Sequence, residues 1–150
     1  MIELTNLAKI KLDEEKLLAL SRKVLLKEGA PKKDLSIVFV GPQRIRQLNK
    51  KYRQKDQSTD VLSFAEKDLP AGLKQIGFSS GLGELIICPI VVKKNSREAK
   101  IAFETELAHV LVHGILHLFG YDHEKSESGA RKMRAREKTY LSGATGNVLK

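Results

Sequence analysis

Three of the chain's four histidines, His113, His117 and His123, occur in one short segment at spacings that suit a shared metal ion. On a helix, residues four apart lie on the same face one turn apart, so His113 and His117 would face one point. Gly120 follows, and glycine commonly ends a helix with a positive φ, which would turn the chain and bring His123 back. A catalytic zinc ion usually has three protein ligands, such as three imidazoles, and keeps its fourth position open. The segment therefore predicts a metal-dependent hydrolase.

The fourth histidine, His109, lies one turn before His113 and is the alternative third ligand. At about 1.5 Å rise per residue, His109 and His117 would be roughly 12 Å apart along a straight helix. Metal–nitrogen bonds are only about 2.0–2.1 Å long, so one helix supplies two adjacent ligands but not three. His123 is the favoured third ligand, and His109 is interpreted as a packed histidine or one that supports a ligand. Zinc is expected, although nickel, copper or iron could compete for imidazole nitrogens.

The same spacing occurs in the metzincin proteases, whose pattern is HExxHxxGxxH. Their glutamate directly after the first histidine is the general base, but here that position is Gly114, which cannot take a proton. A metallopeptidase is therefore one alternative, and it would need a base from elsewhere. A non-catalytic protein with a structural metal is the other. Its site would be closed by a fourth ligand such as Asp122, Glu124 or a distant residue.

The size and composition of the chain suit a single globular domain over residues 1–150. Lys and Arg number 27 against 18 Asp and Glu, a formal net charge of +9, which favours a polyanion such as RNA or DNA over a merely lysine-rich solvated surface. One cysteine, Cys88, excludes an internal disulfide and fits a reducing compartment. No apolar stretch approaches the length of a membrane span. These features lead us to expect a cytoplasmic protein without a membrane partner.

The order of hydrophobic patterns predicts an α+β fold, in which helices pack on a small mixed β-sheet. Strands are expected at residues 2–4, 35–40, 59–64 and 83–88, and helices at residues 13–28, 42–53, 91–99, 103–119 and 126–141.

The helix predicted at 103–119 carries apolar residues on nearly all sides, so it should be the buried central helix and a rigid base for the two histidines. Residues 66–81 contain several Gly, Ser and Pro and predict a long loop that could flank or cover the site. The tail at 143–150 is expected to be frayed.

A second group of residues with chemical potential lies where the helix at 42–53 ends. Arg53 leads there into a polar loop, amid other basic residues: Arg44, Arg46, Lys50, Lys51 and Lys55. The outer lysines are interpreted as a solvated helix face. The planar guanidinium of Arg53 could instead bind a phosphate oxygen through two hydrogen bonds, or stabilise charge in a phosphoryl transition state.

With these residues in view, the chain resembles the YbeY family of bacterial endoribonucleases. Four blocks carry the resemblance, with x for positions that do not count: LNxxYRxKD at 48–56, TDVLSF at 59–64, LGELxI at 82–87 and HGxLHLxGYDH at 113–123. The departures are small: Ser58 and Ala65 stand where many relatives have proline, and Glu84 where aspartate is common. They leave the histidines untouched and affect the loops around Arg53.

The resemblance implies a zinc-dependent, single-strand-specific endoribonuclease that acts in 16S rRNA 3′-end maturation and ribosome quality control. Its partners would be ribosomal RNA and the small ribosomal subunit or its proteins, with no DNA expected. The family's metal ligands fall on His113, His117 and His123, and its functionally important arginine on Arg53, so Arg53 and His113 are the expected catalytic residues. Zinc would lower the pKa of water toward about 7 or polarise a phosphoryl oxygen. Asp122 is expected either as general base or to orient a ligand.

Overall fold

A computed structural model of the chain describes residues 1–68, 81–122, 124 and 126–149, with side chains up to residue 142. His123 and most of the loop predicted at 66–81 lie outside the described residues. The described part of that predicted loop is a 3₁₀ turn at Glu66–Asp68 and Gly81, which is already the first residue of a strand.

Among the described residues, four strands form one mixed sheet in the spatial order β1, β2, β4, β3. The strands are β1 (Ile2–Asn6), β2 (Asp34–Phe39), β3 (Val61–Ala65) and β4 (Gly81–Ile87). β1 and β4 both run parallel to β2, whereas β3 is antiparallel to β4. β2 and β4 are central strands, and their buried Leu, Ile and Phe residues suit strands covered on both faces. The predicted mixed sheet is confirmed.

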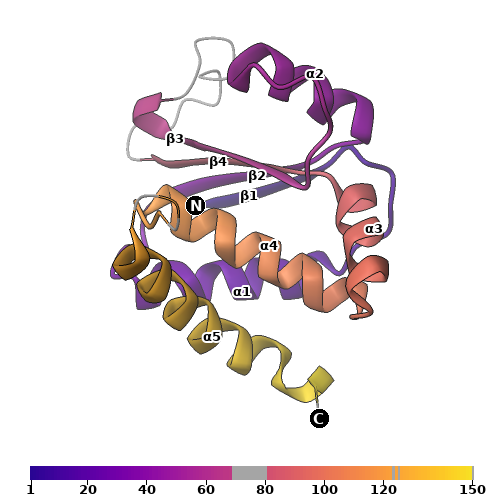
Figure 1. The fold of residues 1–150 in the computed structure, drawn as a ribbon. Helices are drawn as coiled ribbons and strands as arrows, with labels where there is room; N and C mark the ends of the chain where they lie inside the picture. The colour runs from indigo at the N-terminus through magenta and orange to yellow at the C-terminus, as the bar shows by residue number, and fades with distance from the viewer. Residues whose placement is uncertain (69–80, 123, 125, 150) are drawn as a thin grey trace.

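Helices cover both faces of this sheet, which confirms the α+β class (Figure 1). α2 lies on one face, α1 and α4 lie on the other, α5 packs outside α4 and α1, and α3 packs against α4. The helices are α1 (Glu14–Lys27), α2 (Pro42–Arg53), α3 (Pro89–Ala99), α4 (Phe103–Leu118) and α5 (Glu127–Leu149). None of the helices in the described ranges is long and apolar enough to cross a lipid bilayer.

Local sequence signals explain where several helices begin. Asp13 caps α1, since its side chain accepts a hydrogen bond from the Lys16 N–H at 3.3 Å. Proline opens α2 and α3, at the first-turn position where its missing N–H costs nothing. The predicted end of the last helix near Leu141 is wrong, because α5 continues to Leu149. No proline follows Leu141, and a glycine inside a helix weakens it by only about 1 kcal/mol.

The larger core lies between the sheet and α4. Leu111, Val112, Ile115 and Leu116 of α4 are fully buried, so the prediction of a buried central helix is confirmed. Gly114 brings the helix close to the sheet: a Cβ at this position would lie 2.9 Å from Cδ2 of Leu85 on β4. The helix that carries the histidines is therefore held rigidly against the sheet.

A smaller core lies on the opposite face, between the sheet and α2. Its buried residues are Val40, Ile45, Leu48, Leu62, Phe64, Ile86 and Cys88. Cys88 is fully buried and burial raises the pKa of its thiol, which fits a structural residue rather than a nucleophile. This cluster fixes α2, and with it Arg53 at the end of the helix.

Candidate metal centre and adjoining cleft

The end of α4 has the geometry that its sequence predicts. Gly120 has a φ of +96°, and its N–H bonds the carbonyl of His117 at 3.0 Å. The Tyr121 N–H reaches back to the carbonyl of Leu116 at 3.1 Å. These two bonds form a Schellman motif, in which a positive φ reverses the chain after the last helical turn. The predicted turn after His117 is confirmed.

His113 and His117 face one another from successive turns of α4. Their Nε2 atoms are 3.2 Å apart, and the rings meet edge to face with centroids 4.7 Å apart. Two nitrogens bound to one tetrahedral metal at about 2.0–2.1 Å would be about 3.3 Å apart. The observed spacing therefore fits a single ion shared by the two Nε2 atoms.

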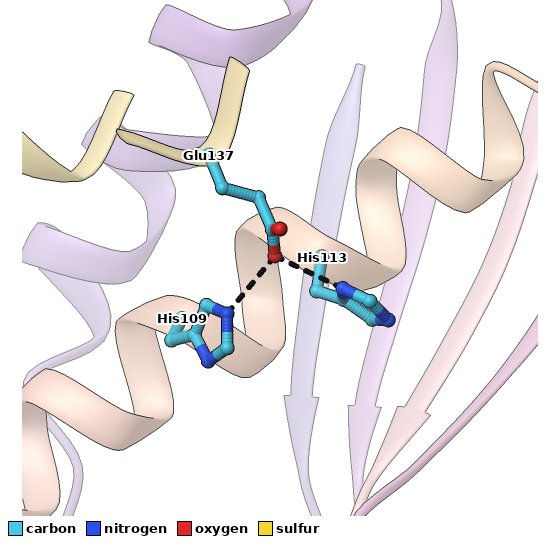
Figure 2. Close-up of side chains that lie close together, drawn as sticks. All are labelled: His109, His113 and Glu137. Carbon is cyan, nitrogen blue, oxygen red and sulfur yellow. Dashed lines mark hydrogen bonds and ion pairs between the residues drawn. The ribbon is translucent and has the colours of Figure 1, made fainter. Parts of the chain in front are cut away.

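The other nitrogen of His113 is held by a carboxylate from α5. Glu137 Oε2 lies 2.9 Å from His113 Nδ1 and 2.9 Å from His109 Nε2 (Figure 2). Only 8% of Glu137 is exposed. Burial alone would raise the pKa of its carboxyl, but hydrogen bonds from the two histidines prevail and lower that pKa to about 2. Glu137 is thus ionised at neutral pH and accepts from both rings.

His109, His113 and Glu137 also form a group that could itself hold a metal ion, because one ligand atom from each lies within 4.8 Å of the others. This group and the pair of His113 with His117 require different atoms of His113. The pair uses Nε2, whereas the group with Glu137 uses Nδ1. With either set of atoms, the described residues could hold a metal ion at this point of α4.

His109 contacts carboxylates on both sides. Besides Glu137, its ring lies 3.4 Å from Glu106 through Nδ1. The hydrogen bond to Glu137 is the main reason that the pKa of His109 is raised, against a smaller lowering by burial. The interpretation of His109 as a residue that supports a ligand stays a prediction, since His109 is also one of the three residues that could hold a metal ion themselves.

Glu137 was not singled out from the sequence, although a signal for it exists. On α5 it lies four residues after Met133 and three before Tyr140, and both of these side chains are fully buried. An acidic residue inside an apolar helical stripe is unusual and indicates a buried partner. The sequence does not identify that partner, because His113 is 24 residues away.

The predicted third ligand, His123, lies outside the described residues. The turn that leads to it is anchored, since the Tyr121 hydroxyl donates to Glu28 Oε1 at 2.9 Å. Asp122 accepts a hydrogen bond from the Glu124 N–H at 2.8 Å. Whether Asp122 is a base or a supporting residue stays a prediction.

Arg53 is the last residue of α2, because Gln54 adopts a left-handed conformation with φ 58°. The guanidinium lies across β3: its Nη2 donates to the carbonyl of Ser63 at 2.7 Å, and the group sits 4.7 Å from the Phe64 ring centroid. Nearby, Asp56 pairs with Arg46 at 2.8 Å and with Lys50 at 3.9 Å. Arg53 is therefore oriented by β3, whereas these neighbours hold the loop after α2.

Arg53 and the two histidines line the same cleft, which has a volume of about 950 Å³. Lys55 and Lys67 add positive charge to its wall. Asp68, Asp122 and Glu124 add negative charge, and Thr59, Ser63 and Tyr121 add neutral polar groups. Residues 53 and 113 are far apart in the sequence, but the fold brings them to one concave surface. His109 is not among the residues that line it.

Comparisons with known proteins agree with this arrangement. The family model described as Endoribonuclease YbeY matches residues 3–145. The chain is 40% identical over 114 residues to Endoribonuclease YbeY of Bdellovibrio bacteriovorus, an alignment that covers 76% of this chain and 69% of the relative. It is 39% identical over 140 residues to Endoribonuclease YbeY of Syntrophotalea carbinolica, with 91% of each chain covered.

A solved structure has the same fold. The solution structure of TM1509 from Thermotoga maritima superposes with a TM-score of 0.68 at 32% identity, covering 98% of this chain and 91% of that one. The match extends over both the histidine helix and the strand that orients Arg53, and it joins a family match that spans nearly the whole sequence. We conclude that the chain belongs to the YbeY family of endoribonucleases.

Proposed function

We propose that this protein is a metal-dependent endoribonuclease that hydrolyses phosphodiester bonds in single-stranded RNA. The observation that carries the proposal is the shared cleft, which is lined both by a guanidinium and by a pair of imidazoles spaced for one metal ion. His113, His117 and His123 are the proposed ligands, and the whole of residues 1–150 is the proposed domain. Arg53 and His113 are the proposed catalytic residues.

Zinc is the metal that this donor set suits best, since neutral imidazoles are common zinc ligands and a catalytic site leaves one position open. When bound, such an ion would supply Lewis-acid activation of water and of a phosphoryl oxygen. The protein's part is to present two Nε2 atoms from a rigid helix, with one ring already oriented by Glu137.

Arg53 is proposed to hold the scissile phosphate and to stabilise the negative charge that develops on it. Its hydrogen bond to Ser63 uses only one of the five guanidinium N–H donors and orients the plane of the group. Lys55 and Lys67 line the same cleft and would bind flanking phosphates. Because such contacts release counterions, RNA binding should weaken steeply as salt rises.

The cellular substrate that we propose is the 3′ end of 16S rRNA, with a further role in ribosome quality control. The small ribosomal subunit or its proteins would be the partners and the cytoplasm the compartment. The endoribonuclease names of the relatives and the net charge of +9 support an RNA substrate.

A metallopeptidase is disfavoured by the packing at Gly114. A glutamate there would be the metzincin base, but even a Cβ would lie 2.9 Å from the buried side chain of Leu85. The position therefore points at the sheet and not into the cleft. A structural metal in a non-catalytic protein is disfavoured by the cleft itself, because a closed site would not need an open cleft that the histidines share with Arg53.

The test is cleavage of end-labelled single-stranded RNA, with a matched duplex beside it, by zinc-loaded wild type, His117→Ala and Arg53→Ala. Arg44→Ala is the matched control, since Arg44 is exposed on the same helix but does not line the cleft. We expect single-strand cleavage by wild type and Arg44→Ala and its loss in the other two. Undiminished cleavage by His117→Ala would indicate a contaminating nuclease and contradict the proposal.

A further inference from the structure

We infer that Glu137 is a positioning residue, which fixes His113 in the tautomer that presents Nε2 to the metal, and that His109 in turn holds Glu137 in place. The inference rests on the proposed function, in which His113 and His117 bind one ion. It assigns α5 a role in the metal centre, although none of the described side chains of α5 lines the cleft.

Proton placement is the first step. An ionised carboxylate can only accept hydrogen bonds, so each imidazole nitrogen that contacts Glu137 must carry a proton. The 2.9 Å contact with Glu137 Oε2 therefore puts the proton of neutral His113 on Nδ1. Its lone pair then lies on Nε2, the atom 3.2 Å from Nε2 of His117.

The distances favour a supporting role over ligation by Glu137. A single oxygen, Oε2, lies 2.9 Å from both His113 Nδ1 and His109 Nε2, the usual length of a charge-assisted hydrogen bond. A metal bound to Nδ1 would displace the proton from that nitrogen and move it to Nε2, facing His117. Ligation and positioning by Glu137 thus predict opposite tautomers of His113.

The carboxylate is delivered from a rigid element. Met133 and Tyr140 flank Glu137 on the buried side of α5 and are fully buried. The Tyr140 hydroxyl donates to Glu28 at the end of α1, and Arg136 lies 3.7 Å from the same carboxylate. Since α5 is tied to α1 on both sides of this turn, Glu137 cannot withdraw from α4 without breaking buried contacts.

His109 completes the chain of contacts that Figure 2 shows in part. It donates to Glu137 through Nε2 and lies 3.4 Å from Glu106 through Nδ1, so the order is Glu106, His109, Glu137, His113. The His109 side chain is 48% exposed, whereas that of Glu137 is 10% exposed. Removing His109 should therefore weaken metal binding less than removing Glu137 does.

The first measurement is the tautomer of His113, from long-range ¹H–¹⁵N correlation of the imidazole nitrogens at mildly alkaline pH. We expect a proton on Nδ1 in the metal-free protein, and the same proton with Nε2 bound to zinc in the loaded protein. His109→Gln and His117→Ala assign the signals. A proton on Nε2 in either state would overturn the inference, and Nδ1 bound to zinc would make Glu137 a ligand instead.

The second measurement is zinc affinity by chelator competition. Loss of a carboxylate that orients a histidine ligand typically weakens metal binding about 10–100-fold, so we expect this range for Glu137→Ala and a smaller loss for the volume-conserving Glu137→Gln. Glu127→Gln, an exposed carboxylate at the start of α5, is the matched control and should not change the affinity. Thermal unfolding of each variant checks that the fold is kept.

The outcomes separate the two proposals. Zinc binding that depends on His117 but is unchanged in both Glu137 variants would overturn the positioning role alone. Zinc binding that is undiminished in His117→Ala, or absent from the wild type, would overturn the proposed metal centre and the role of Glu137 with it.

Discussion

The two faces of the sheet contribute to the cleft in different ways. On one face, α4 is buried almost all round and presents its histidines from a large core. On the other, α2 rests on a small cluster, and Arg53 is an exposed residue at its end, oriented by one hydrogen bond and one ring contact. A metal site needs its ligands held closely, whereas a guanidinium that meets a mobile phosphate tolerates more freedom. The more rigid packing thus lies on the face where the proposed metal ligands are.

β3 contacts the elements on both faces of the sheet. Because successive residues of a strand point to opposite faces, Ser63 faces α4 and Phe64 faces α2. The Ser63 carbonyl accepts from Arg53, and its hydroxyl lies 3.4 Å from the carbonyl of Gly114 on the histidine helix. Movement of this edge strand would therefore shift the arginine relative to the histidines.

The largest expected effect on RNA cleavage comes from removing a histidine of α4. His117→Ala, or zinc removal by a chelator, should reduce RNA cleavage to background because the ion loses its site. The fold should persist, since α4 is held by apolar packing, and far-UV circular dichroism should change little. Unfolding on chelation would instead support a structural metal and contradict the division of roles between the two faces.

A second test places a side chain between α4 and the sheet. Gly114→Glu restores the metzincin pattern but should destabilise the protein by on the order of 4 kcal/mol. Overpacking against Leu85 contributes about 1–3 kcal/mol and an unpaired buried polar group about 1–3 kcal/mol. Chemical denaturation measures this loss. A stable variant with peptidase activity would show that the packing at Gly114 is not what excludes that chemistry.

The third test concerns Arg53, on the α2 face of the sheet. Arg53→Ala should lower the rate of cleavage about 100-fold, the lower end for loss of one donor to a developing oxyanion, while leaving zinc affinity unchanged. Arg53→Lys should recover part of this loss, because it keeps the charge but not the paired donors. Single-turnover cleavage beside Arg44→Ala is the measurement. A parallel fall in zinc affinity would mean that Arg53 supports the histidines instead of the phosphate.

The features that the sequence predicted correctly depend on local contacts, and those that it missed depend on contacts between distant residues. The period of α4, the turn at Gly120 and the proline start of α2 depend on neighbouring residues and were found correctly, whereas α3 begins at Pro89, two residues before its predicted start. Glu137 depends on how α5 packs across α4, which no local pattern encodes. The strand order, in which β4 lies between β2 and β3, depends on equally distant pairing. The pairing of His113 with His117 was therefore predictable, and the contact of Glu137 with His113 was not.

The smallest expected effect is a change in stability caused by a buried carboxyl on the face that α2 covers. Glu84 on β4 is 5% exposed, pairs across the sheet with Phe64, and shares the side of the strand that Ile86 turns toward α2. Burial raises the pKa of this carboxyl, so folding favours its protonated form. The wild type therefore loses stability as the pH rises through the folded-state pKa.

Glu84→Gln removes that penalty and should stabilise the protein at neutral pH by about 0.5–1 kcal/mol, the usual size of a single stabilising substitution. The gain should disappear as the pH falls below about 4.3, the value for an unfolded glutamate, because both states of the wild type are then protonated. Urea denaturation of both proteins at neutral and acidic pH measures it. A gain that stays constant with pH would show that ionisation of Glu84 is not its cause, and that the α2 face tolerates a buried charge without loss of stability.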